Sequence, residues 1–209
     1  MEYLINHYPK ILNLLCEHIF LTFTSLFISM LIAFPIGIFA STHKKFRKIT
    51  TKLLGLCYII PSMALFALLI PFTGLGFKSA IITLVMYSQF ILVRNITKGL
   101  NEVPNSIIDA GYGMGYSNIQ LLFKIKLPIS LPVILAGIRV ATVSIISLTT
   151  LAAWINAGGL GVLIFEGIYQ QNSIKILTGT TLITILSITS NQLITYLEKK
   201  YVKEKSTTA

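Results

Sequence analysis

The residue types that most often bind metals or carry out catalysis are scattered along this chain. Its histidines lie far apart and make no cluster with the spacing of metal ligands, at His7, His18 and His43. Cys16 precedes the first apolar stretch, whereas Cys57 lies inside the second, so their predicted depths do not suit a disulfide. We therefore expect no metal site and no disulfide.

Two glycine-containing strings resemble nucleotide-binding loops only in part. A phosphate loop needs a glycine directly before its Lys-Ser pair, and Phe77 occupies that position before residues 78–79. The glycines within residues 111–115 lack the spacing of a dinucleotide-binding loop, and no predicted strand precedes them. No Ser/His pair and no pair of carboxylates lies within an apolar stretch. We expect no enzyme active site and no cofactor bound by this chain.

The composition indicates a membrane protein. Of the 209 residues, 54% are hydrophobic and 11% are charged, and the mean hydropathy is +0.78. A span needs about 20 apolar residues, so the length allows about six helices and excludes a transporter of about twelve. The fold class is therefore an all-α integral membrane protein with about five transmembrane helices, predicted at 19–40, 53–72, 79–93, 131–155 and 176–197.

The distribution of basic residues predicts the orientation in the membrane. The formal net charge is +10, and most Lys and Arg residues follow the first, third and fifth apolar stretches. Short cytoplasmic loops are enriched in such residues, so we expect the N-terminus outside and the C-terminus inside. Only Lys10, Lys78 and Lys175 fall on the predicted outer side. Membrane orientation explains the positive charge, and we expect no nucleic-acid partner.

These boundaries divide the chain into three parts. They are an extracytoplasmic N-terminal segment (1–18), a membrane domain (19–198) with a cytoplasmic loop at about 98–130, and a basic cytoplasmic tail (199–209). The first apolar stretch is longer than a signal peptide core and lacks a basic segment before it, so we interpret it as an uncleaved span. Residues 162–169 are too short to span and are expected to be external or re-entrant.

Glycine and proline positions leave two interpretations open. Pro61 is either a tolerated kink in the second span or a hinge, because proline removes a backbone N–H. The external glycines Gly158, Gly159 and Gly161 are either a flexible turn or a shaped external loop.

Aromatic residues give the candidates for a transport pathway. Tyr58, Tyr87, Phe90 and Trp154 are placed to line one, together with Pro61. Aromatic faces attract quaternary ammonium groups by about 0.5–2 kcal/mol each. Tyr and Trp are also common in interfacial belts and in helix packing, so a structural role stays open for each of them.

The residue pattern of the cytoplasmic loop predicts a docking element. Pro104 can open a short helix at about 106–112, which Ser106 could cap. Small residues at 110–115 would let another surface approach closely, and Asp109 lies near the positive end of the helix. A second, amphipathic helix is expected along the membrane from Ile119, ending where Pro128 turns the chain upward.

The same loop resembles the EAA signature of ABC importer permeases. The matching positions are Asp109, Ala110, Gly111, Gly115, Ile125, Leu127 and Pro128. Asp replaces the usual Glu, and Gly111 replaces the second Ala. Further strings at 60–65, 113–115, 131–139, 150–153 and 157–161 are similar to those of the glycine betaine, carnitine and choline osmoprotectant permeases. Asn156 stands where that family more often has Gly.

This resemblance implies a type I ABC importer in a bacterial cytoplasmic membrane. Its implied partners are a second permease chain, identical or homologous, a cytoplasmic ATPase dimer that binds ATP and Mg, and an extracytoplasmic solute-binding protein. The helix around Asp109 to Gly115 would dock in a cleft of the ATPase. Two alternatives remain, a permease for another small solute such as an amino acid or a betaine-like thione, and a secondary transporter that works without ATP.

Overall fold

The computed structural model describes residues 2–207, and the side chains of residues 7–200. Met1 and residues 208–209 of the predicted tail lie outside the described residues. Every regular element in the described part is helical, and the order is α1 (Glu2–Thr42), α2 (Lys44–Ile59), α3 (Ser62–Thr73), α4 (Phe77–Asn101), α5 (Asn105–Gly113), α6 (Asn118–Leu121), the π-helical turn η1 (Leu122–Lys126), α7 (Leu127–Ala152), the 3-10 turn η2 (Ala153–Ile155), α8 (Gly161–Tyr169) and α9 (Ser173–Thr207).

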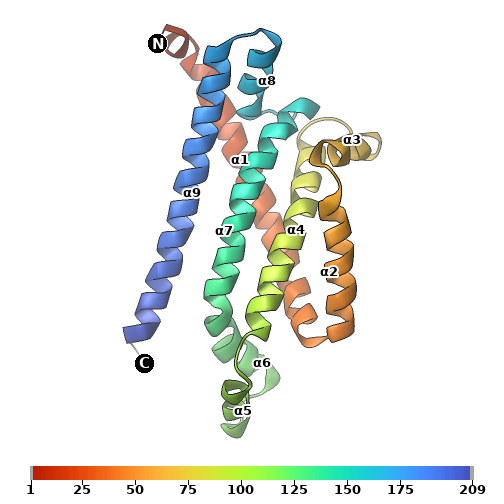
Figure 1. Ribbon diagram of the computed structural model, residues 1–209, viewed down its shortest axis with the longest axis vertical. Coiled ribbons are helices and arrows are strands. Elements are labelled where there is room, and N and C mark those ends of the chain that lie inside the picture. Colours follow the sequence, from red (N-terminus) through yellow and green to blue (C-terminus); the bar gives the residue numbers. More distant parts are fainter. Residues whose placement is uncertain (1, 208–209) are drawn as a thin grey trace.

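The helices form an elongated bundle in which α4 packs against both α1 and α7 (Figure 1). Four helical stretches within the described residues are long and apolar enough to cross a membrane, and α2 with α3 makes a fifth if the bent pair counts as one span. The N-terminus and α8 lie at one end of the bundle, and α5, α6 and the end of α9 lie at the other (Figure 1). The positive-inside bias predicts that the end that carries α5 is cytoplasmic.

The core lies between α1, α4 and α7, and small residues bring these helices close together. A Cβ atom added at Gly37 of α1 would lie 2.6 Å from Ile96 of α4. Polar side chains also join the helices, because the Ser88 hydroxyl donates to the Ser29 hydroxyl at 2.6 Å. Glycine contacts and interhelical hydroxyl bonds are the usual means of helix packing in a bilayer.

The helix that contains the first predicted span begins well before Ile19. α1 is one continuous helix whose earlier turns pack on the rest of the protein. Ile11 and Leu14 are buried in a cluster with Leu160 and Leu163, at the start of α8. Residues before the apolar stretch therefore remain helical because they cover a distant element, which local hydropathy does not reveal.

The predicted second span over 53–72 is divided between two helices. α2 and α3 meet at an angle of 97°. Ile60 and Pro61 between them have extended backbone, with ψ of 129° and 133°. Proline disfavours a helical conformation at the residue before it and supplies no N–H to continue the helix. Pro61 therefore marks a complete break rather than a tolerated kink.

Candidate functional site

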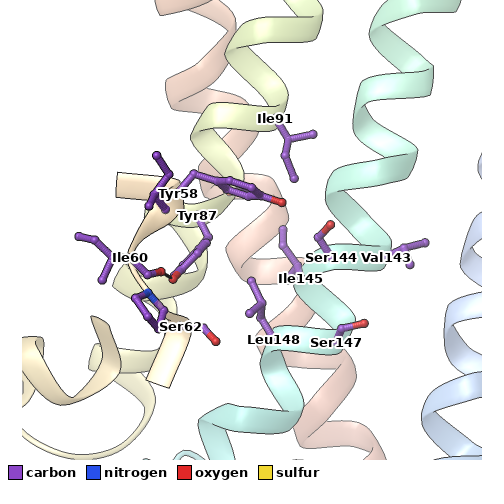
Figure 2. Close-up of a pocket in the computed structure, with 13 residues that line it drawn as sticks. Tyr58, Ile60, Ser62, Tyr87, Ile91, Val143, Ser144, Ile145, Ser147 and Leu148 are labelled. Carbon is purple, nitrogen blue, oxygen red and sulfur yellow. Dashed lines mark hydrogen bonds between the residues drawn. The ribbon is translucent and has the colours of Figure 1, made fainter. Parts of the chain in front are cut away.

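A cavity of about 490 Å³ opens at the break between α2 and α3, and α4 and α7 form its other walls (Figure 2). Among the described residues that line it, none is charged. The polar part of its lining consists of hydroxyl groups, from Tyr58, Ser62, Tyr87, Ser88, Ser144 and Ser147. The cavity can thus hydrogen-bond a solute without binding it through a fixed charge.

Three of the aromatic residues singled out in the sequence come together at this cavity. The ring of Tyr58 on α2 lies 5.9 Å from that of Tyr87 and 5.1 Å from that of Phe90, both on α4. Tyr58 and Tyr87 line the cavity, and Phe90 lies behind them. Trp154 does not join the group, because it lies in η2 and is absent from the cavity wall.

A side-chain hydrogen bond satisfies a backbone carbonyl at the helix break. The Tyr87 hydroxyl donates to the carbonyl oxygen of Ile60, as Figure 2 shows. This carbonyl precedes α3, and a backbone acceptor left unpaired in a bilayer would cost several kcal/mol. Tyr87 therefore has a structural role at the break in addition to its place in the cavity wall.

The serines of the cavity were missed at the sequence level. Ser144 and Ser147 lie one turn apart on α7, and Ser88 faces them from α4. Their spacing along α7 is a weak signal, since single hydroxyl residues are common in membrane helices and bond to their own backbone. Only the packing of α4 on α7 brings them to one wall.

The external glycines form a loop that two side chains of α1 contact. Gly158 and Gly159 adopt left-handed backbone, with φ of 83° and 82°. The N–H of Gly159 donates to Glu17 Oε2 at 3.0 Å. The N–H of Leu160 donates to His18 Nδ1 at 3.3 Å. Two consecutive residues of α1 therefore fix the loop in place.

His18 links this loop to α7. Its side chain is completely buried, and its Nε2 lies 3.1 Å from the carbonyl oxygen of Ile146. Because Nδ1 accepts a hydrogen bond from Leu160, Nε2 must carry the proton and donate to Ile146. Neutral His18 thus satisfies one donor and one acceptor at the same time.

Next to this loop, α8 is bound by ion pairs to α1 and α9. The Glu166 carboxylate accepts hydrogen bonds from Lys10 Nζ at 2.8 and 2.9 Å and from Lys175 Nζ at 3.0 Å. The hydrogen bond from Lys10 is the largest cause that lowers the pKa of Glu166 below its usual value of 4.5; Lys175 adds to it, and burial opposes both.

This lowered pKa predicts acid sensitivity of the extracytoplasmic end. The charged form of Glu166 stabilises the folded state above pH 4.5, and this contribution is lost as the pH falls from 4.5 through the lower pKa of the folded protein. Pairs this exposed contribute about 0.2–1 kcal/mol, so we expect the midpoint of thermal unfolding to fall by about 1–4 °C over that window. Comparing wild type with Glu166→Gln in one pH series isolates this carboxylate. Equal acid sensitivity of the two proteins would refute the prediction.

At the opposite end, α5 is the predicted docking helix, but Ser106 is not its cap. The helix starts at Asn105 with Pro104 as the preceding residue, and no side chain bonds to its first N–H groups. Its C-terminus is closed by two backbone bonds, from Gly115 N–H to the Tyr112 carbonyl and from Tyr116 N–H to the Gly111 carbonyl. This closure needs left-handed backbone at Gly115, where φ is 80°.

The glycines of this segment have different roles. Gly111 is buried, and a Cβ added there would lie 2.9 Å from Cδ1 of Ile125. A Cβ added at Gly113 or at Gly115 would have no neighbour within 4 Å. Gly111 therefore lets α5 pack on η1, whereas Gly115 shapes the backbone and leaves an open surface beside exposed Asp109 and Ala110.

The expected turn of the chain at Pro128 is absent. α6, η1 and α7 follow one another without a break, and Pro128 is the second residue of α7, directly after the π-helical turn η1. Leu127 packs against the core between α1, α4 and α7. Ile125 in η1 thus contacts α5, and the same continuous helix enters the membrane core.

Comparison with known proteins identifies the family to which these features belong. Residues 33–203 match the model of the family "Binding-protein-dependent transport system inner membrane component". The chain is 36% identical over 172 residues to the carnitine transport permease protein OpuCB of Listeria monocytogenes, covering 82% of this chain and 79% of the relative. It is 30% identical over 184 residues to the glycine betaine/carnitine/choline transport system permease protein OpuCB of Bacillus subtilis, covering 88% and 85%.

The fold has a close counterpart among solved structures. A chain of the MetNI methionine ABC transporter, in an inward-facing conformation, superposes with a TM-score of 0.81. That match covers 88% of this chain and 93% of the other at 23% identity, so it shows the fold. The all-α class and the multi-pass membrane location predicted from the sequence are thereby confirmed. The chain belongs to the binding-protein-dependent inner membrane components, the permease subunits of type I ABC importers, in which a separate partner subunit hydrolyses ATP.

Proposed function

We propose that this chain is a permease subunit of an ATP-driven importer for a trimethylammonium osmoprotectant such as glycine betaine, carnitine or choline. The observation that carries the proposal is the cavity at the α2–α3 break, which combines aromatic rings with hydroxyl groups and has no charged residue among the described residues of its wall. The names of the relatives supply the class of solute.

The cavity suits such a solute chemically. A trimethylammonium group has no N–H to donate, so it does not require a carboxylate to accept one. The rings of Tyr58 and Tyr87 offer cation–π attraction of about 0.5–2 kcal/mol each. The hydroxyls of Ser144 and Ser147 on α7 can hydrogen-bond a carboxylate or a hydroxyl at the other end of the solute. Attraction of this size lets the solute enter and also leave, as transport demands.

The docking helix supplies a route from ATP hydrolysis to the cavity. In this proposal α5 sits in a cleft of the ATPase dimer, whose subunits bind ATP and Mg. A displacement of α5 passes through the contact between Gly111 and Ile125 into η1 and α7. Because α7 carries Ser144 and Ser147, its movement changes the cavity wall. Alternating access then follows from repacking of α7 against the break between α2 and α3.

The remaining partners belong to the same proposal. A second permease chain, identical or homologous, completes the pathway, and a solute-binding protein delivers the cargo to the extracytoplasmic end. The loop at Gly158, Gly159 and Gly161 lies at that end, held by Glu17 and His18. A fixed loop offers a defined surface for the binding protein at low entropic cost.

Recovery of partners from membranes tests the assembly. A tagged chain extracted in mild detergent should retain an ABC ATPase and a solute-binding protein, identified by mass spectrometry. Uptake of labelled carnitine into proteoliposomes containing the whole complex should require ATP and the binding protein. Uptake without ATP would support a secondary transporter, and competition on the binding protein by an amino acid or a thione, but not by betaines, would overturn the proposed cargo.

A further inference from the structure

A second cavity lies between α2 and α4 near the cytoplasmic end of the bundle. It has a volume of about 280 Å³. Arg47 and Thr51 contribute from α2. The wall on α4 consists of Arg94, Thr97, Lys98 and Asn101, and Glu102 follows the end of this helix. Residues four apart on a helix share a face, so Arg94 and Lys98 present their charges to this cavity one above the other.

The positive charges of this cavity are not balanced within the described residues. Lys98 Nζ lies 3.7 Å from Glu102 Oε1, which offsets one charge. Neither Arg47 nor Arg94 forms an ion pair with any described carboxylate. Arg94 instead lies over the ring of Phe90, 5.8 Å from its centroid. Two guanidinium groups thus remain without an anionic partner in a cavity of the right size for an anion.

The depth of the cavity favours a lipid headgroup as the source of that anion. Arg94 precedes the end of α4 by about two turns, or about 10 Å, which places its charge near the membrane boundary. α2 exposes Ile49, Leu53 and Leu56 on its other side, and this apolar face suits acyl chains. Basic pockets between membrane helices on the cytoplasmic side bind phosphate-containing headgroups.

We propose that the cavity between α2 and α4 binds the phosphate of an anionic phospholipid. Arg47 and Arg94 hold the phosphate oxygens, because the guanidinium fork matches phosphate geometry with two parallel hydrogen bonds. Lys98 contributes a further positive charge at the rim. The acyl chains of the lipid then extend along α2, so the lipid joins α2 to α4 on the cytoplasmic side of the helix break.

Lipid retention tests this site without any transport measurement. The purified complex is placed in phosphatidylcholine nanodiscs with a minor fraction of phosphatidylglycerol, extracted in mild detergent and analysed for bound lipid by mass spectrometry. We expect the wild type to be enriched in phosphatidylglycerol. The double variant Arg47→Gln and Arg94→Gln should reduce this enrichment about tenfold or more.

A control double variant distinguishes lipid binding in the cavity from general attraction of anionic lipid to surface charge. Lys45→Gln with Lys52→Gln removes the same charge from exposed positions of α2 that do not line the cavity, and should change the enrichment less than about twofold. Equal loss in both pairs would overturn the proposal. Arg47→Lys with Arg94→Lys keeps the charge but loses the guanidinium fork, so its enrichment should lie between that of the wild type and that of the glutamine pair. If the lysine pair loses the enrichment as completely as the glutamine pair does, helix packing explains the effect and the proposal is overturned.

Two further measurements identify whether the bound anion is a lipid headgroup. Inorganic phosphate should displace phosphatidylglycerol no better than chloride at equal ionic strength, because the site recognises a phosphate held in a membrane. Stronger displacement by phosphate would show a site for a soluble anion. Enrichment that appears only after the ATPase has been removed from the complex would show that protein contacts occupy the cavity. Either result would refute the lipid proposal.

Discussion

Uptake is expected to be lost when Gly115 is replaced by aspartate, while the chain still inserts in the membrane. The left-handed backbone at Gly115 closes α5, and a Cβ there would meet open space. The substitution therefore places a carboxylate on the proposed ATPase contact without disturbing the packed core. An unpaired charge buried in an interface costs about 2–5 kcal/mol, which corresponds to about 30-fold or more in affinity.

The measurement combines ATP-dependent uptake with recovery of the ATPase on the tagged chain. Gly115→Asn is the matched control, since asparagine tolerates left-handed backbone and adds no charge. We expect the asparagine variant to retain most of the uptake and of the bound ATPase. Normal uptake in the aspartate variant would contradict the docking role of α5.

A tryptophan at Ser144 should block the pathway. Ser144 lies on α7 in the wall of the cavity and opposite the break between α2 and α3. An indole at this position would fill space that the proposed solute must cross. We expect uptake to fall about tenfold or more, with the ATPase still bound, because α5 is untouched.

Thr189→Trp provides the control for this prediction. Thr189 is exposed on α9 and lines none of the described cavities, so its replacement adds the same bulk away from the proposed pathway. Uptake by this variant should remain near that of wild type. If the two tryptophan variants transport equally well, the cavity at the helix break is not the route of the solute.

The sequence was most informative where structure depends on local pattern. Apolar stretches of sufficient length predicted the membrane-spanning class, and the comparisons confirm it. The short helix of the cytoplasmic loop was predicted within about two residues of α5, since proline before it and glycine after it act on neighbouring residues. The functional role of that helix stays a prediction.

Features that depend on distant contacts escaped the sequence analysis. Nothing near Glu17 or His18 indicates that both fix a loop more than a hundred residues later. Ser106 looked like a helix cap, but Pro104 already fixes the start of α5 one residue earlier. Trp154 and Tyr58 are both aromatic, yet Tyr58 at the end of α2 lines the cavity and Trp154 in η2, after α7, does not. Residue type suggested these candidates, and only packing distinguishes among them.

The break between α2 and α3 also bears on how the protein enters the membrane. Until α4 has been synthesised, the carbonyl of Ile60 lacks the Tyr87 hydroxyl that it accepts from in the folded protein. An unpaired carbonyl among lipid tails is unfavourable by several kcal/mol. We therefore expect the segment 44–73 to stay at the translocon until α4 has been synthesised. The helices α2, α3 and α4 then enter the bilayer together.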